Sequence, residues 1–172
     1  HIHQSPSDGK KTLFDDAKSE RSMSKLFESY LAGQVACLME FAPMFWPTIN
    51  SYKRLVDGFW APVKPTWGVD NRTASFRAIP GSPKSTRLET RCPGADVNPY
   101  LAIAAVVAAG LHGVEKGLKL TTRPIHGTNE GSEDIPRAPR TLIETTRIFR
   151  DSALARDWFG DDFVAHFAAT RD

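Results

Sequence analysis

Apolar and polar residues follow two different periods along this chain of 172 residues. Between residues 18 and 41, apolar side chains recur at helical spacing, which predicts one amphipathic helix that ends before Pro43. Residues 1–5, 72–79 and 86–91 instead alternate between apolar and polar side chains, which is the period of a strand. The pattern therefore predicts a domain that mixes helices and strands.

A second helix is predicted over residues 98–116. Asn98 suits the cap position, Pro99 suits the first turn, and Gly117 suits the turn that ends the helix. Because this segment is rich in alanine and apolar nearly all round, we expect other elements to bury it. Shorter helices are expected over 140–149, 153–158 and 161–168, the last of them capped by Asp161.

Two long segments follow neither period. Residues 43–70 are rich in proline, glycine and aromatic side chains, and residues 121–140 contain several glycines and prolines. A long irregular segment inside a compact domain is usually functional or disordered, and the aromatic content of 43–70 argues against disorder. We therefore expect residues 43–70 to form a binding loop.

Composition narrows the possible functions. The length suits one domain, and the net charge of +2 does not suggest a nucleic-acid partner. The apolar run at 101–109 is too short to span a membrane. Cys37 and Cys92 lack metal-binding or redox spacing, so we interpret them as reduced structural thiols, which favours a cytoplasmic location. The chain opens as if in mid-strand, so we expect a fragment of a longer protein.

The candidate chemistry is concentrated on one predicted strand. Arg87, Glu89 and Arg91 share a face, because side chains alternate along a strand. A carboxylate between two guanidinium groups is typical of a phosphoryl-transfer site, where such a face meets a metal ion and several anionic groups. It is also typical of an exposed strand face held by salt bridges, and the spacing does not distinguish the two.

A metal site is the second hypothesis. His1 and His3 share one strand face, and with Glu89 they are donors suited to Mg²⁺ or Mn²⁺, with substrate phosphates completing the coordination. Such a site needs further carboxylates. The available ones are Asp70, Asp57 and Glu40, and none of them has a compelling context in the sequence.

Three further cations are candidates for binding anions. Lys84 lies on the turn before the Arg87 strand, where it either contacts a phosphate or is simply solvated. The odd spacing of Arg72 and Arg77 puts them on opposite faces of one ideal strand.

Several motifs, in order, resemble the catalytic domain of glutamine synthetases. The opening His-Ile-His-Gln-Ser is similar to that family's metal- and nucleotide-binding strand, and residues 50–56 read Asn-Ser-Tyr-Lys-Arg-Leu-Val. The other matching segments are 71–77, 82–84, 87–91 and 98–102. The resemblance covers nearly the whole chain, most strongly residues 47–118.

The resemblance implies an α+β catalytic domain in which antiparallel strands form an active-site funnel with packed helices. It also implies homo-oligomers of stacked rings, in which active sites form between neighbours with the help of a separate N-terminal domain. Residues 1–172 would be part of this catalytic domain, without the N-terminal domain and the upstream catalytic strands. Alone, this fragment is expected to be inactive.

The reaction implied by the resemblance depends on ATP and on Mg²⁺ or Mn²⁺. Glutamate is phosphorylated on its side-chain carboxylate, and ammonia or an organic amine then displaces the phosphate to form an amide. The implied metal ligands are His1 and Glu89, and the implied glutamate ligands are Arg54 and Arg91. Arg72 and Arg54 are the implied catalytic residues, and Arg72 and Arg77 match positions that stabilise the phosphoryl groups. The implied nucleotide contacts are His3, Ser5, Arg77, Lys84 and Arg87.

One position departs from the family pattern. Glutamine-forming members carry a glutamate in the loop after the 50–56 motif, where it takes a proton from ammonium. Trp60 stands there in this chain, and an indole cannot accept that proton. It suits the wall of a pocket for a larger amine, which resembles the family branch that makes γ-glutamyl amides from organic amines.

Three functions stay open. The preferred hypothesis is a ligase that joins glutamate to an organic amine. The alternative is a non-catalytic structural relative: the matched arginines with His1 and Glu89 favour the enzyme, whereas Trp60 favours the relative. The third is glutamine synthesis with another group in place of the loop glutamate. The family's remaining metal carboxylates lie upstream of His1, outside this chain.

Overall fold

The computed structural model describes residues 1–57, 61–128 and 132–171. Its strands form one sheet in the order β1-β4-β3-β2, and their bounds are β1 (Ile2–Gln4), β2 (Trp67–Val69), β3 (Phe76–Ile79) and β4 (Arg87–Thr90). β4 runs antiparallel to both of its neighbours, whereas β2 and β3 are parallel. The expected α+β fold is confirmed, with one parallel pair at the edge of the sheet.

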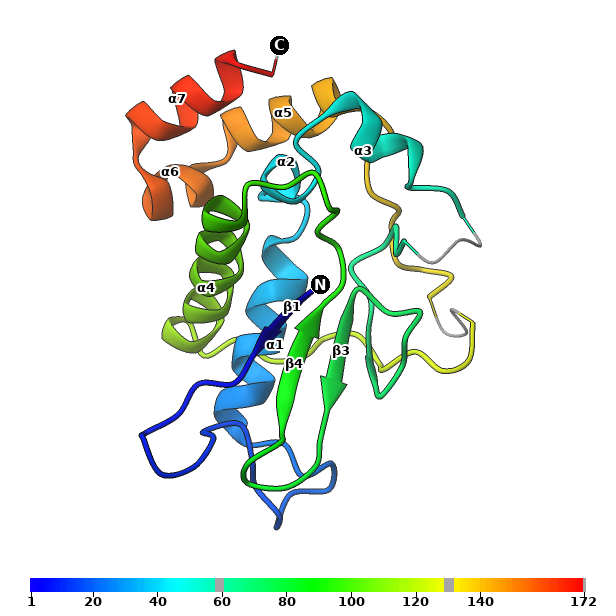
Figure 1. Ribbon diagram of the computed structural model, residues 1–172, viewed down its shortest axis with the longest axis vertical. Helices are drawn as coiled ribbons and strands as arrows, with labels where there is room; N and C mark the ends of the chain where they lie inside the picture. The colour runs from blue at the N-terminus through cyan, green and yellow to red at the C-terminus, as the bar shows by residue number, and fades with distance from the viewer. Residues whose placement is uncertain (58–60, 129–131, 172) are drawn as a thin grey trace.

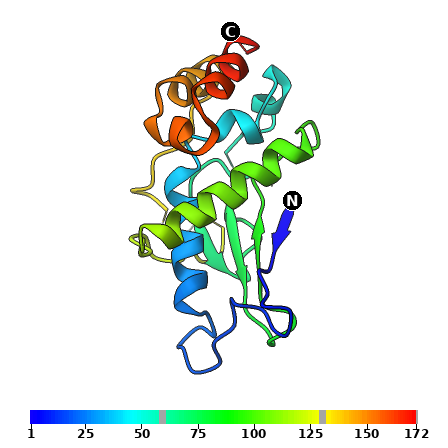
Figure 2. The ribbon, with the colours of Figure 1, turned by 90° about the vertical axis from the view of Figure 1, so that its left-hand side faces the viewer.

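Two helices, α1 and α4, lie on one side of the sheet (Figure 1). α1 lies behind the strands, and α4 packs across α1, as the side view shows (Figure 2). α5, α6 and α7 pack together at one end of the molecule, beyond α2. The bounds are α1 (Lys25–Cys37), α2 (Ala42–Phe45), α3 (Ile49–Lys53), α4 (Pro99–Glu115), α5 (Leu142–Asp151), α6 (Ala153–Phe159) and α7 (Asp161–Ala169).

A partly buried polar network joins β1 to α1 and β4. Tyr30 Oη and Gln34 Nε2 donate hydrogen bonds to Gln4 Oε1 at 2.9 and 2.5 Å, and Gln4 Nε2 donates to Thr90 Oγ1 at 2.9 Å. Thr90 in turn donates to Gln34 Oε1 at 2.5 Å. Because side chains alternate along a strand, fixing Gln4 on the helix side directs His3 to the opposite, open face.

The first helix is shorter than predicted. α1 begins after Ser24, whose Oγ accepts a hydrogen bond from the Phe27 backbone N–H at 3.1 Å, so residues 18–24 are not helical. This side-chain cap satisfies a backbone donor that the helix leaves free. Pro43 does not end this helix, because α1 already ends at Cys37. It lies in the first turn of α2, where a missing N–H costs no hydrogen bond.

The segment 43–70 is more regular than the predicted binding loop, because it contains α2, α3 and β2. α3 spans five residues, and the capping box formed by Thr48 and Ser51 starts it. A helix this short has no detectable apolar period, which is why the sequence pattern missed it. Residues 58–60 of this segment lie outside the described residues.

The strand predicted from residue 72 begins only at Phe76. Asn71 Oδ1 accepts hydrogen bonds from the Thr73 backbone N–H and Oγ1, both at 2.8 Å, and this local turn competes with strand pairing. Arg72 therefore lies in a turn. The prediction that Arg72 and Arg77 occupy opposite faces of one strand was wrong for that reason.

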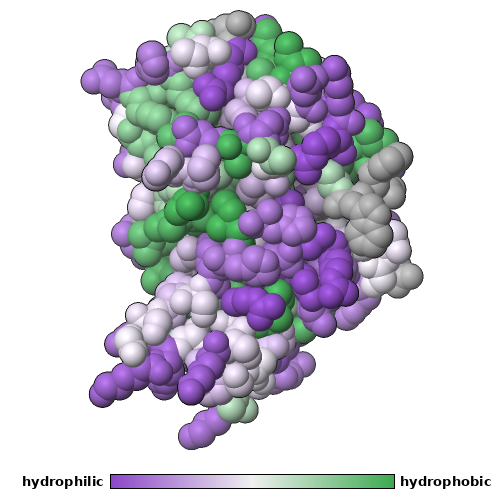
Figure 3. Space-filling model, in the orientation of Figure 1, coloured by the Kyte–Doolittle hydropathy of each residue, from purple (hydrophilic) through white to green (hydrophobic). Residues whose placement is uncertain are grey.

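The α4 helix begins and ends as predicted. Asn98 Oδ1 accepts from the Tyr100 backbone N–H at 3.0 Å, and Gly117 turns the chain with φ of +58°. The expected burial holds for one side only. Ile103 and Val107 are 50% and 41% exposed, and an apolar patch covers α4 in Figure 3. No helix in the described part of the chain is long and apolar enough to cross a membrane.

The C-terminal helices lie close to their predicted positions. Ser152 Oγ caps α6 by accepting from the Ala155 backbone N–H at 2.8 Å. Asp161 is the first residue of α7 and not its cap. Gly160 precedes it with φ of +82°, which an L residue rarely adopts, so glycine takes the cap position.

α1 and α4 approach each other closely at facing glycines. A Cβ added to Gly33 would overlap Ala109 O and the backbone of Gly113. A Cβ added to Gly113 would overlap Ser29 O. The absence of side chains at these two positions lets the helix backbones touch, and this contact holds α4 over the core.

We predict that Gly33→Ala lowers the free energy of unfolding by about 1–3 kcal/mol, because overpacking forces the helices apart. The sign of the change in unfolding free energy distinguishes overpacking from helix propensity. Propensity alone makes alanine more stabilising than glycine by about 1 kcal/mol. Urea unfolding measures the effect, with the exposed Ala104→Gly as a control for propensity. Equal or greater stability of Gly33→Ala would contradict the close contact.

Candidate active site

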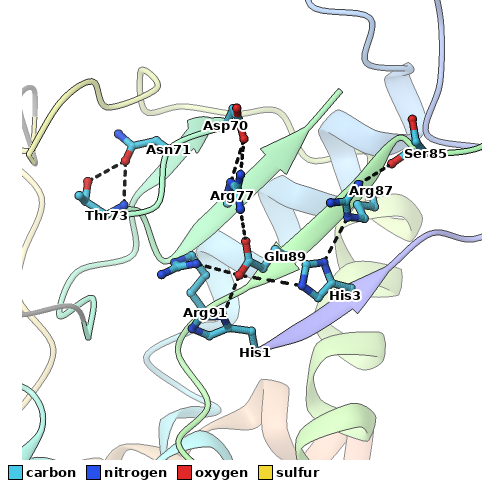
Figure 4. Close-up of polar contacts among 10 residues, drawn as sticks. All are labelled: His1, His3, Asp70, Asn71, Thr73, Arg77, Ser85, Arg87, Glu89 and Arg91. Atoms are coloured by element: carbon cyan, nitrogen blue, oxygen red, sulfur yellow. Dashed lines mark hydrogen bonds and ion pairs between the residues drawn. The ribbon is translucent and has the colours of Figure 1, made fainter. Parts of the chain in front are cut away.

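Glu89 on β4 is the centre of a charged cluster on the open face of the sheet (Figure 4). Its side chain is 3% exposed. Oε2 accepts a hydrogen bond from Arg77 Nη1 at 3.0 Å, and Oε1 accepts one from Arg91 Nη1 at 2.7 Å. A buried carboxylate needs such partners, because desolvation strongly penalises an unpaired charge. The alternative interpretation predicted an exposed strand face held by salt bridges. The salt bridges are present, but the Glu89 side chain is buried.

Histidines from the start of the chain border this carboxylate. His1 Nδ1 lies 2.8 Å from Glu89 Oε1, and His3 Nε2 lies 4.0 Å from the same atom. The register pairs His3 with Glu89 directly. Arg87 Nε donates to His3 Nδ1 at 3.3 Å, and Arg87 Nη1 donates to Ser85 O at 3.0 Å. The open face of β1, β3 and β4 thus brings two imidazoles and the guanidinium groups of Arg77 and Arg91 to one carboxylate, with Arg87 beside His3.

His1 and Glu89 fit a divalent cation in donor type and spacing. The 2.8 Å between His1 Nδ1 and Glu89 Oε1 is close to the separation of about 3 Å between adjacent ligands of an octahedral Mg²⁺. Mg²⁺ usually keeps several waters and takes substrate phosphates, so a protein supplies few ligands. Among residues 1–57, 61–128 and 132–171, no group of three or more histidine, cysteine or acidic side chains is arranged to hold a metal.

Asp70 belongs to the cluster, although nothing in its sequence context indicated this. Arg77 Nε donates to Asp70 Oδ1 at 3.0 Å, so one guanidinium joins Asp70 to Glu89. This hydrogen bond and the charge of Arg77 lower the pKa of Asp70. The backbone of Asp70 has φ of +50°, a region that aspartate tolerates better than most residues. The link depends on the parallel pairing of β2 with β3, which the sequence pattern did not predict.

The two other carboxylates considered for a metal serve elsewhere. Asp57 Oδ2 accepts from Arg137 Nε at 3.3 Å, and Glu40 accepts a hydrogen bond from Ser152. Neither contacts the Glu89 cluster through a hydrogen bond or ion pair in the described residues.

Arg54 lines a cavity of about 500 Å³ that His1 of the Glu89 cluster also lines. It lies at the C-terminal end of α3 and lines this cavity together with His1, Asn50 and residues 93–96. Arg91 lies differently: it is 6% exposed, and its buried Nε has no hydrogen-bond partner in the described part of the chain. Of these two arginines, Arg54 is the one that faces an open cavity.

Asp96 holds α3 in place, a role that no sequence motif indicated. Its Oδ2 accepts from Ser51 Oγ at 2.6 Å and from Thr48 Oγ1 at 2.8 Å. Partial burial favours the neutral acid, but these hydrogen bonds and the nearby charge of Arg54 lower the pKa of Asp96. A Cβ on Gly94 would overlap both Arg54 Nη1 and Asp96 Oδ1, so this glycine leaves room for the guanidinium.

Of the other predicted site residues that the structure describes, Ser5, Arg72 and Lys84 make no hydrogen bond or ion pair with Glu89. Ser5 Oγ lies 2.9 Å from Thr86 O, towards the 80–86 turn that also carries Lys84. Arg72 is exposed, and its charge contributes to the lowered pKa of Asp70. The side chains of Arg72 and Lys84 make no hydrogen bond or ion pair with any described residue. Trp60 lies outside the described residues.

Comparison with known proteins gives a consistent family match. The family model described as "Glutamine synthetase, catalytic domain" matches residues 1–172. Type-1 glutamine synthetase 2 of Dictyostelium discoideum is 49% identical over 99% of the chain and 34% of its own length. Gamma-glutamylethanolamide synthetase GlnA4 of Streptomyces coelicolor is 44% identical over 97% of the chain and 35% of its own length.

Two further matches extend this result. Glutamate–isopropylamine ligase of a Pseudomonas species is 40% identical over 98% of the chain and 37% of its own length. A solved structure described as a GmaS/ADP complex superposes with a TM-score of 0.83 at 28% identity, covering 98% of this chain and 40% of that one. The chain thus spans a little over a third of the length of these curated relatives.

We predict that Asp96→Asn destabilises the protein at neutral pH and that this difference disappears in acid. The folded-state pKa of Asp96 is lowered, so its contribution is complete above the ordinary aspartate pKa of 3.8 and is lost as the pH falls through the lowered value. Urea unfolding at a series of pH values from 7 down into the acid range measures this, with the exposed Asp157→Asn as a control. An effect of Asp96→Asn that stays equal over the whole series would contradict the role of the charge.

Proposed function

Because this chain belongs to the glutamine synthetase family, we propose that it forms part of the active site of an ATP-dependent ligase that joins glutamate to an organic amine. The side-chain carboxylate of glutamate attacks the γ-phosphorus of ATP, which gives γ-glutamyl phosphate and ADP. The amine then attacks the acyl carbon and releases inorganic phosphate. The observation that carries the proposal is the buried Glu89 carboxylate between Arg77 and Arg91, beside two imidazoles.

The arginines supply fixed positive charge to the phosphoryl group. In a phosphoryl-transfer reaction, catalysis depends mainly on positioning and on stabilising charge that develops on the transferring oxygens. Arg77 is held from two sides by Asp70 and Glu89, so its guanidinium is oriented before a substrate binds. Arg72 lies in the turn beside Asp70, and we assign it to the transferring phosphoryl group.

His1 and Glu89 would hold the Mg²⁺ or Mn²⁺ ion of this reaction. When bound, such an ion neutralises the phosphates of the nucleotide. The nucleotide is assigned to the β1–β4 edge that leads away from this pair. The side chains along that edge are His3, Arg87, Ser5 and Lys84, and the cationic ones among them suit phosphate oxygens.

Glutamate is assigned to the cavity that Arg54 lines with His1 and Asn50. Arg54 suits direct contact with a substrate carboxylate, since a guanidinium binds a carboxylate through two parallel hydrogen bonds. Arg91 is buried against Glu89, so we assign it to the inner wall of the glutamate site.

An organic amine is the proposed second substrate. The relatives named gamma-glutamylethanolamide synthetase and glutamate–isopropylamine ligase support this choice, and so does Trp60 at the position of the family's loop glutamate. The relative named glutamine synthetase 2 keeps ammonia as an alternative. The charged cluster disfavours a non-catalytic relative, because apolar side chains of similar volume would often be as stabilising in a purely structural role. The whole protein is proposed to act as a cytoplasmic homo-oligomer of stacked rings.

We predict that Arg54→Ala in the full-length protein raises the KM for glutamate by about 10- to 100-fold, as expected for losing a charged hydrogen bond worth about 1.5–3 kcal/mol. Nucleotide binding should stay unchanged. Steady-state kinetics with glutamate and direct titration with ADP separate the two effects, and the neighbouring exposed Lys53→Ala is the control. Equal weakening of glutamate and ADP binding would contradict the assignment.

We predict that Trp60→Glu shifts the preference of the full-length enzyme from an organic amine towards ammonia, because a carboxylate accepts a proton from ammonium and an indole does not. Phosphate release from ATP with Mg²⁺ and glutamate is measured with ammonia and with a panel of organic amines. An unchanged ratio of the two rates would remove Trp60 as a specificity residue. If no amine stimulates phosphate release by the folded wild-type protein, the non-catalytic alternative replaces the enzyme.

A further inference from the structure

A second cavity, of about 530 Å³, lies between the start of α1 and the segment 117–124 that comes after α4. This volume is in the range of small-molecule binding sites. Its walls come from three distant parts of the chain: residues 21–29, Trp67 and residues 117–124. In Figure 1 the chain leaves the end of α4 and runs across towards the sheet.

This cavity faces away from the Glu89 cluster. Trp67 is paired with Phe76, and Phe76 is paired with Thr90, so these three side chains share the helix-covered face of the sheet. Arg77 follows Phe76 and Glu89 precedes Thr90, so these two side chains point to the other face. The cavity therefore shares no lining residue with the candidate active site, and a ligand bound in it is independent of the proposed ligase function.

The lining is strongly basic. Four cations surround the cavity, namely Arg21, Lys25, Lys119 and Arg123, and Glu28 is the single carboxylate among its described lining residues. This is an excess of three positive charges, whereas the whole chain has a net charge of +2. Within residues 1–57, 61–128 and 132–171, none of these four side chains forms an ion pair or donates a hydrogen bond. Concentrated and unneutralised positive charge around a concave site favours an anionic ligand.

The wall behind these cations is fixed. Trp67 is 2% exposed, and its Nε1 donates to Thr122 O at 3.0 Å, while the Ile125 backbone N–H donates to Trp67 O at 2.8 Å. The guanidinium carbon of Arg21 lies 6.0 Å from the centre of the Trp67 ring, the outer limit of a cation–π contact. Rigid walls reduce the entropy lost when a ligand binds.

One polar atom of the wall lacks a partner. Thr122 lines the cavity, and its buried Oγ1 makes no hydrogen bond within the described part of the chain. Buried hydroxyl groups are nearly always hydrogen-bonded, so an unpaired one is a sign of a missing partner. An anion with several oxygens in this cavity offers acceptors both to the cations and to such a donor.

We propose that this cavity binds a small anion with two linked phosphate groups. A diphosphate carries about three negative charges at neutral pH, which matches the excess of three positive charges around the cavity. The two arginines suit phosphate because their planar donors bind two oxygens at once, and the two lysines add mobile point charges. The diphosphate is either free or part of a nucleotide.

The test is calorimetric titration of the full-length protein with inorganic pyrophosphate at physiological salt. The cavity variant is Arg21→Gln/Lys119→Gln, and the control is Lys10→Gln/Arg147→Gln, which removes the same charges from exposed positions outside the cavity. The wild type and the control should bind pyrophosphate alike, whereas the cavity variant should lose one binding event or bind at least tenfold more weakly. Pyrophosphate binding that is unchanged in the cavity variant, or absent in the wild type, would overturn the proposal.

Two further ligands define the class. ADP shows whether the diphosphate is recognised alone or as part of a nucleotide: a larger loss for ADP than for pyrophosphate in the cavity variant indicates a nucleotide, and an equal or smaller loss indicates the free diphosphate. Citrate carries a similar charge on carboxylates and should bind the cavity at least tenfold more weakly than pyrophosphate. If citrate binds the cavity as tightly, the assignment to phosphate is wrong.

Discussion

The burial of one carboxylate organises this molecule. Glu89 is almost fully removed from water, and a charge in that position is tolerated only with partners of opposite sign. Arg77 and Arg91 meet this requirement from the neighbouring strand and from the residue just beyond β4. Asp70 then shares Arg77, and His1 approaches the remaining side of the carboxylate. Together these contacts fix the side chains on the open face of the sheet in one arrangement.

The two faces of the sheet serve different purposes. On the helix side, Gln4 and Thr90 join α1 through hydrogen bonds that are partly or fully buried, and aromatic residues contribute to the core. The alternation of strand side chains transfers that rigidity to the open side, where His3 and Glu89 face each other. Hydrogen bonds also hold α3 in place. Asp96 accepts from Thr48 and Ser51 at the start of α3, and Arg54 at its end lines the cavity with His1. Packing on one side thus positions charge on the other.

Much of the site could be predicted from the sequence, because strand alternation is a local rule. Period two placed Arg87 and Glu89 on one face, and the Asn98 and Pro99 pair located the start of α4. The links that depend on non-local pairing were missed. Asp70 meets Arg77 only because β2 pairs with β3 in parallel, and Asp96 meets Ser51 across 45 positions of sequence. Short elements were missed for another reason: α3 is too brief to show a period, and a side-chain turn at Asn71 displaced the start of β3.

We propose that the Glu89 face serves a reaction in which glutamate is phosphorylated on its side chain. Transfer of an oxygen isotope from glutamate to the released phosphate tests this. The full-length protein is supplied with ATP, Mg²⁺, an accepted amine and glutamate labelled with oxygen-18 in its side-chain carboxylate, and the released phosphate is analysed by mass spectrometry. If γ-glutamyl phosphate forms, expulsion by the amine leaves one labelled oxygen on each phosphate. Release of unlabelled phosphate alongside amide formation would contradict the claim, because the carboxylate oxygen would not have reached phosphorus.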